Sequence, residues 1–327
     1  MPEPSLPSKR TRRGRLARWS AALVVLSAVA GYVVVQYDTG RRSGPGCTVV
    51  SGKGDGATYE FTPEQAVNAA TITAVGTARE LPERAVTIAL ATALQESALR
   101  NIDHGDRDSL GLFQQRPSQG WGTPKEIMDP AYAAGKFYEH LEEVPGYTRL
   151  PLTVAAQRVQ RSGFPQAYAK HEPDAALLAA ALTGRSAATL TCEGRPAATP
   201  RAGADAVREA LVRDFGRDAL EPAGAEVDAA PSSSAGAPAQ SGGSGASDRR
   251  TVRLPVTAGE GTDAGPRGWQ LAHWAVANAS GLHIERVSYA GREWRAGHTD
   301  SRWRTVDGRN SEGSDDDAGV VTVTTMP

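Results

Sequence analysis

The sequence feature that most constrains the fold is a helix-length stretch at residues 82–99, PERAVTIALATALQESAL. From Ala85 to Leu94 a helix built from this stretch is apolar on nearly every face. Such a helix is stable only where other elements cover it on all sides. The sequence therefore predicts a domain assembled around one buried helix.

Further helices are predicted on both sides of this stretch. Thr, Asp and Pro at the start of several segments favour helix initiation, because Thr and Asp accept hydrogen bonds from the first turn and Pro suits the first helical position. These starts are Thr62-Pro63, Thr123-Pro124 and Asp129-Pro130, and residues 151–162 and 173–183 supply two more helices. No sustained apolar–polar alternation occurs here, so we expect residues 47–192 to be an all-α domain.

A second folded piece is predicted after a linker. Residues 193–250 are rich in Ala, Gly, Pro and Ser, with one amphipathic helix at about 205–220. Residues 251–327 alternate short strand patterns with one helix and hold four of the chain's six tryptophans, Trp269, Trp274, Trp294 and Trp303. We expect a small α+β module with a binding or anchoring role, whose tryptophans form either a glycan-binding face or, more often in so small a unit, its core.

The N-terminus indicates export. Residues 1–20 are basic and residues 21–37 are apolar and uncharged, a pattern typical of a signal anchor. We expect a single-pass membrane protein that contacts the cytoplasmic membrane through residues 21–37, has residues 38–46 as a short linker and carries its later domains outside the cell. A signal cleaved after residues 28–30 is the alternative, and it would make the protein secreted.

The chain has two cysteines, Cys47 and Cys192, placed on either side of the predicted helical domain. In an oxidising compartment we expect them to form one disulfide that closes this domain. Two free thiols are the alternative. The formal net charge is −1, so no basic surface points to nucleic acid as a partner.

Glu96 is the first candidate for chemistry. A carboxyl group in the last turn of an apolar helix is desolvated and faces the negative end of the helix dipole, and both effects raise its pKa. A raised pKa is what a general acid needs near neutral pH. A solvated glutamate near a helix end is the alternative.

Two short motifs carry a resemblance to a known family. Gln95-Glu96-Ser97 ends the buried helix, and Gly111-Leu112-Phe113-Gln114 follows, with Trp121 beyond it. Over residues 60–190 this resembles the lysozyme-like fold of soluble lytic transglycosylases and related actinobacterial cell-wall lysins. The resemblance implies that Glu96 is catalytic and that the G-L-x-Q segment faces it across a cleft that binds peptidoglycan strands.

The resemblance also suggests residues that bind substrate. Gln114 is a plausible amide donor to the sugars, Gly111 allows close backbone approach, and Trp121 either stacks on a sugar or simply packs. The third motif of the family, A-Y-N-A-G, is absent as such, and Gln157 or Gln160 stands where its Asn is expected. The candidate substrate-binding set is Ser97, Gly111, Phe113, Gln114, Trp121, Gln157 and Gln160.

A hydrolase that uses two carboxylates would take the second from Asp106 or Asp108, whereas a lytic transglycosylase needs only Glu96. No His or Cys spacing suggests a metal site, and no phosphate- or dinucleotide-binding motif occurs, so we expect neither a metal nor a cofactor. The sequence predicts a membrane-tethered peptidoglycan lytic enzyme. The alternative is a non-catalytic wall-binding or scaffold protein with the same fold.

Overall fold

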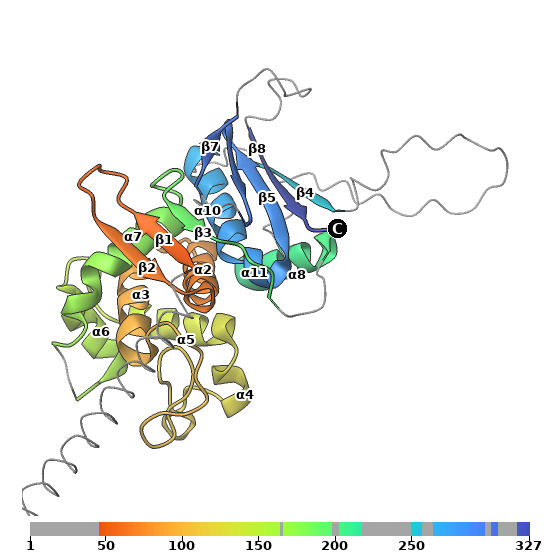
Figure 1. Ribbon diagram of the computed structural model, residues 1–327. Coiled ribbons are helices and arrows are strands. Elements are labelled where there is room, and N and C mark those ends of the chain that lie inside the picture. Colours follow the sequence, from red (N-terminus) through yellow and green to blue (C-terminus); the bar gives the residue numbers. More distant parts are fainter. Residues whose placement is uncertain are drawn as a thin grey trace, which may run out of the picture. The chain divides into compact units, whose positions relative to one another are not determined.

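Figure 1 presents a computed structural model of the chain. It describes residues 46–163, 166–197, 203–217, 250–256, 264–297, 302–306 and 319–327. All of these belong to one compact unit.

The predicted buried helix is confirmed and lies at the centre of the helical part. Helix α3, Glu83–Ser97, buries every residue from Ala85 to Leu94. The helices in contact with it are α2 (Pro63–Ala78), α5 (Pro130–Glu142), α6 (Leu152–Gln160) and α7 (Glu172–Leu182), and the short helix α4 (Pro124–Ile127) packs on α5 (Figure 1).

The predicted helix starts are confirmed too. Thr62 accepts from the backbone N–H of Gln65 at 3.3 Å, and Gln65 Oε1 accepts from the N–H of Thr62 at 2.8 Å. This reciprocal pair satisfies two amide groups that a helix start leaves unpaired. Thr123 and Asp129 cap α4 and α5 in the same manner, by accepting from first-turn amides.

The predicted all-α class is wrong, because the structure is mixed, with nine helices and two antiparallel sheets in the part of the chain that it describes. The first sheet has the order β2-β1-β3, formed by β1 (Cys47–Val50), β2 (Thr58–Phe61) and β3 (Leu190–Cys192). These strands have three or four residues each, which is too short for a visible alternation of apolar and polar side chains.

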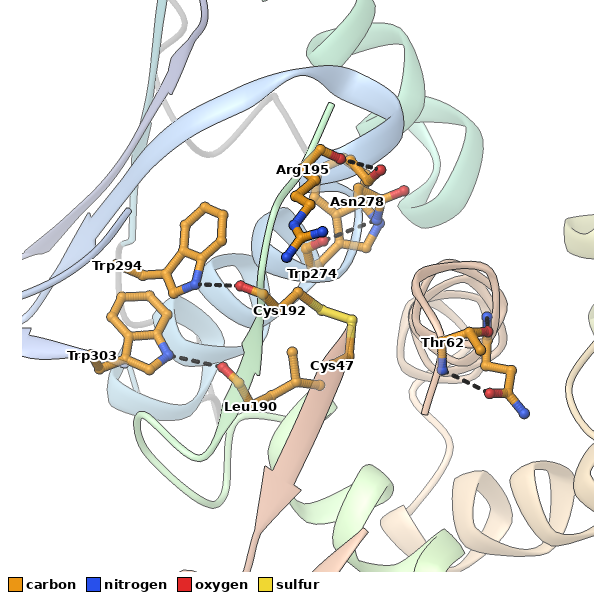
Figure 2. Close-up of a disulfide and its surroundings, with 11 residues drawn as sticks. Cys47, Thr62, Leu190, Cys192, Arg195, Trp274, Asn278, Trp294 and Trp303 are labelled. Carbon is orange, nitrogen blue, oxygen red and sulfur yellow. Dashed lines mark hydrogen bonds between the residues drawn. A yellow bond between two sulfur atoms is a disulfide. The ribbon is translucent and has the colours of Figure 1, made fainter. Parts of the chain in front are cut away.

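The predicted disulfide is confirmed. Cys47 of β1 lies directly opposite Cys192 of β3, and their sulfur atoms are bonded (Figure 2). The bridge joins the first strand of the helical part to its last, so it closes nearly the whole of that part into one loop and restricts the unfolded chain.

The C-terminal residues form the expected α+β arrangement. Strands β4 (Thr251–Pro255), β5 (Ile284–Tyr289), β6 (Arg292–Arg295), β7 (Arg304–Thr305) and β8 (Val320–Thr325) make an antiparallel sheet with the order β4-β8-β5-β6-β7. The helices of this region are α8 (Ala204–Phe215), α10 (Ala264–Ala277) and α11 (Ala279–Leu282).

Helix α10 joins this sheet to the helical part. It contacts β5 and β8 of the sheet, and it also contacts α2, α7 and β3. Gln270 Nε2 donates to Thr77 Oγ1 of α2 at 2.6 Å, and His273 Nδ1 lies 2.7 Å from the carbonyl oxygen of Ala181 in α7. Burial lowers the pKa of His273 to about 4, so its ring is neutral at pH 7. Residues Trp269 to Ala277 are all buried because α10 is covered from both sides.

The four tryptophans of this region are core residues rather than an exposed glycan-binding face. All are buried, and two of them bond the free edge of strand β3 (Figure 2). Trp294 Nε1 donates to the carbonyl oxygen of Cys192 at 3.0 Å, and Trp303 Nε1 donates to that of Leu190 at 2.9 Å. The indoles therefore satisfy carbonyl groups that no neighbouring strand pairs.

Helix α8 is fixed by a buried carboxylate. The side chain of Asp214 is fully buried, and it accepts from Thr71 Oγ1 of α2 at 3.2 Å and from Trp274 Nε1 of α10 at 2.8 Å. Arg213 Nε pairs with it at 2.9 Å. One carboxylate thus ties together three helices that are distant in sequence.

The predicted membrane helix at residues 21–37 and the basic segment at residues 1–20 lie outside the described residues. Within the described ranges, no helix is both long and apolar enough to cross a membrane. This finding contradicts the predicted single-pass membrane localisation, which is not retained.

Candidate active site

Glu96 lies in the last turn of α3, where the helix stops abruptly. The two residues after the helix, Ala98 and Leu99, have left-handed backbones with φ of 54° and 58°. They turn the chain away, and the N–H of Ala98 closes the helix on the carbonyl of Leu94 at 3.1 Å. The carboxyl group of Glu96 is therefore at the negative end of the helix dipole, and its side chain is half-buried.

Two side chains from other elements bond this carboxyl group. Tyr168 Oη donates to Glu96 Oε1 at 2.6 Å, and Gln160 of α6 is a second hydrogen-bond partner. Burial raises the pKa of Glu96 above that of an ordinary glutamate, and the bonds from Tyr168 and Gln160 oppose this rise in part. The rise outweighs the opposing bonds, so Glu96 holds a proton at higher pH than a solvated glutamate does.

The structure brings the two sequence motifs into direct contact. Leu110 and Gln115 pair through two backbone hydrogen bonds, which folds the G-L-F-Q residues into a tight loop. Ser97 Oγ donates to the carbonyl oxygen of Leu112 in this loop at 2.8 Å. Gln160 Nε2 donates to the carbonyl oxygen of Phe113 at 2.7 Å. Gln160 therefore bridges the loop and Glu96.

Gly111 is the residue that permits this loop. Its φ is +73°, and a Cβ placed on it would lie 2.8 Å from the carbonyl oxygen of Ile127 in α4. Its N–H donates to the carbonyl of Ile102 at 2.7 Å. Only glycine combines a left-handed backbone with such a close approach to another main chain.

Replacing Gly111 with alanine is expected to lower the free energy of unfolding by about 2 kcal/mol, because the substitution adds a clash with Ile127 to the strain of a left-handed alanine. Gly120→Ala is the matched control, since Gly120 has φ of +83° and open space where a Cβ would lie. We expect it to cost about 1 kcal/mol. Urea unfolding of both variants measures the difference, and equal losses would mean that the contact with Ile127 does not matter.

The side chains of other predicted substrate-binding residues pack or form hydrogen bonds within the protein. Phe113 is fully buried and stacks on Phe137 with ring centroids 4.7 Å apart. Gln114 Nε2 turns back to the carbonyl oxygens of His104 and Gly111, each at 3.3 Å. These two side chains therefore shape the loop rather than present themselves to a ligand.

The side chains of Trp121 and Gln157 also contact other parts of the protein. The Trp121 ring packs on His140 of α5, with centroids 4.3 Å apart. Gln157 Nε2 donates to the carbonyl oxygen of Ser162 at 2.7 Å and so stabilises the chain after α6. Of the predicted set, the structure therefore gathers Ser97, Gln160 and the backbone of Phe113 around Glu96.

The two candidate second carboxylates differ. Asp108 Oδ1 accepts from Arg116 Nε at 2.7 Å and Oδ2 accepts from the N–H of Ser118 at 2.9 Å. The bonds from Ser118, followed by that from Arg116, hold the pKa of Asp108 well below its usual range. Asp106 is 93% exposed. Asp108 is thus a structural anion in its loop, and Asp106 is a solvated surface group.

Tyr168 was not predicted as a site residue. It lies 72 positions after Glu96 and precedes the short turn η2 (Ala169–His171), in a segment with no recognisable motif. It is fully buried, and burial together with the charge of Glu96 raises its pKa, so it remains a hydrogen-bond donor at all working pH values. Its only sequence signal is that a buried tyrosine needs a partner for its hydroxyl group.

A pocket of about 460 Å³ lies elsewhere on the protein, between α2, the start of α5 and α8. It is lined by Val67, Thr71, Lys125, Met128, Asp129, Pro130, Ala131 and Arg213. Neither Glu96 nor its hydrogen-bond partners line it, so we do not include it in the candidate site. Among the described residues, no three His, Cys, Asp or Glu side chains are placed to hold a metal ion.

Comparison with protein-family models gives no match to this chain, and comparison with curated proteins gives no significant match. The chemistry of the site and the resemblance of its motifs are therefore the observations that bear on its function.

Proposed function

We propose that this protein is a peptidoglycan lytic enzyme that cleaves the bond between N-acetylmuramic acid and N-acetylglucosamine, with Glu96 as its catalytic carboxyl group. The observation that carries the proposal is the environment of Glu96. It is a half-buried carboxyl with a raised pKa, held by Tyr168 and by Gln160, which also holds the G-L-F-Q loop. A surface glutamate without a role would have none of these constraints.

The proposed reaction uses Glu96 twice. Protonated Glu96 first donates its proton to the glycosidic oxygen, and the bond to the anomeric carbon breaks as positive charge develops on the sugar ring. The resulting carboxylate then accepts a proton from the nucleophile that attacks this carbon. Tyr168 stabilises the carboxylate formed in between, because its hydroxyl group donates to Oε1.

The surroundings of the acidic loop favour a mechanism with one carboxylate. Both oxygens of Asp108 accept hydrogen bonds within the loop, so this group is poorly suited to act as a nucleophile or base. With a single carboxyl group, the attacking nucleophile is the 6-hydroxyl of the same muramic acid residue, and the product is a 1,6-anhydro sugar. This is the lytic transglycosylase reaction.

The test is to incubate the purified full chain with a cell-wall suspension and to analyse the released muropeptides by mass. We expect 1,6-anhydro ends. Reducing ends would indicate a hydrolase with a second carboxylate, for which Asp106 is the remaining candidate. No release across a range of pH would overturn the proposal and favour the non-catalytic wall-binding protein.

Changing Tyr168 to phenylalanine is expected to shift the alkaline limb of the kcat/KM profile to higher pH. The hydroxyl group of Tyr168 lowers the pKa of Glu96 by bonding its charged form, so the variant keeps the acid protonated at higher pH. We also expect about a tenfold lower maximum rate, because one charge-assisted hydrogen bond is lost. Tyr147→Phe, a half-buried tyrosine outside the site, is the control and should leave the profile unchanged. If the alkaline limb of the kcat/KM profile does not shift in Tyr168→Phe, Tyr168 does not affect the pKa of the catalytic acid.

A further inference from the structure

The turn at residues 168–171 holds the end of α3 through two consecutive residues. Tyr168 bonds Glu96, and His171 Nε2 lies 3.2 Å from Oε1 of the preceding residue, Gln95. A backbone bond from the N–H of His171 to the carbonyl oxygen of Tyr168, at 3.1 Å, fixes the spacing of the two side chains. The turn that orients the catalytic carboxyl group therefore also orients its neighbour.

The contact with His171 engages the oxygen of the Gln95 amide group and leaves its nitrogen unengaged. Burial, followed by the charge of Lys170, lowers the pKa of His171, so the ring is neutral at pH 7. In the tautomer with its hydrogen on Nε2, the ring donates to one lone pair of Gln95 Oε1. Gln95 is only half-buried, and within the described part of the chain its Nε2 has no hydrogen-bond acceptor. Gln95 thus presents two N–H donors that are not engaged within the described part of the chain, on the residue next to Glu96.

We propose that Gln95, oriented by His171, is a specificity-determining residue that recognises the acetamido carbonyl of an N-acetylated sugar. This rests on the proposed function. An unengaged N–H donor binds an acceptor, and a carbonyl oxygen accepts without requiring a donor in return. A sugar without its acetyl group presents an ammonium there, which cannot accept. The site should therefore discriminate against de-N-acetylated glycan.

The test measures binding in a chain that cannot cut. In the Glu96→Gln background, dissociation constants are determined for a hexamer of N-acetylglucosamine and for the corresponding glucosamine hexamer. Adding Gln95→Met, which keeps the side-chain length and removes both donors, should weaken binding of the acetylated hexamer about fivefold, as expected for one hydrogen bond. Binding of the glucosamine hexamer should change less than about twofold.

Two variants of His171 test the orienting role. His171→Phe should reproduce the selective loss, whereas His171→Gln should restore most of the affinity because its amide can donate to Gln95 from a similar distance. Equal weakening for both hexamers, no weakening in Gln95→Met, or no binding of either hexamer to the parent chain would overturn this inference. Muropeptide release by the wild type decides the proposed function separately, and circular dichroism reports whether each variant is folded.

Discussion

Changing Glu96 to glutamine is expected to lower muropeptide release at least about 100-fold, because an amide of the same size cannot donate the proton that breaks the glycosidic bond. The fold should survive. A neutral amide at this position is solvated much as the protonated carboxyl group is, and it can still accept from Tyr168. The measurement is the rate of muropeptide release, with helical circular dichroism and wall binding recorded on the same samples.

Glu143→Gln is the matched control for charge. Glu143 follows helix α5, and its side chain is 79% exposed. This variant should release muropeptides at the wild-type rate. Undiminished release by Glu96→Gln would show that another group is the acid, and the proposed mechanism would then be wrong.

Changing Asp214 to alanine is expected to lower the free energy of unfolding by about 4 kcal/mol, because a buried carboxylate is removed while its donors remain. The hydroxyl group of Thr71 and the indole N–H of Trp274 would be left inside the protein without an acceptor. These donors belong to α2 and α10, so the loss should weaken the attachment of the C-terminal region to the helical part. Urea unfolding followed by tryptophan fluorescence measures it.

Asp205→Ala is the control within the same helix. The side chain of Asp205 is 93% exposed and pairs with Arg208 at 2.9 Å. Its loss should cost less than about 1 kcal/mol, the range of a surface ion pair and a first-turn acid. If the two variants unfold at similar urea concentrations, the buried carboxylate does not hold α8, α2 and α10 together.

Local chemistry explains what the sequence could predict. The Thr62–Gln65 capping pair and the apolar run of α3 act through neighbouring residues, so each leaves a readable pattern. The expected position of Glu96 in the last turn of a buried helix follows from the same run. The disulfide was predictable for another reason, since the sequence led us to expect export, and two cysteines have only one way to pair within one chain.

Long-range contacts explain what the sequence could not predict. Strands β1 and β3 pair across nearly the whole helical part, and strands of three or four residues carry no periodicity. Tyr168 and His171 reach the site only because η2 lies against the end of α3. Phe113 was predicted as a ligand contact from its motif, whereas its burial depends on its contact with Phe137 of α5. For Trp121, the structure shows the packing alternative, against His140 of the same helix.

The tryptophan bonds to strand β3 also bear on aggregation. A strand at the edge of a sheet exposes main-chain groups that can pair with a strand of another molecule. In this protein Trp294 and Trp303 occupy the carbonyl groups of that edge at Cys192 and Leu190 (Figure 2). A chain cut before β4 would lose both indoles and uncover the edge, so a shortened protein would tend to self-associate by strand addition. The two indole bonds from the C-terminal sheet are therefore expected to protect this edge of the helical part from strand addition.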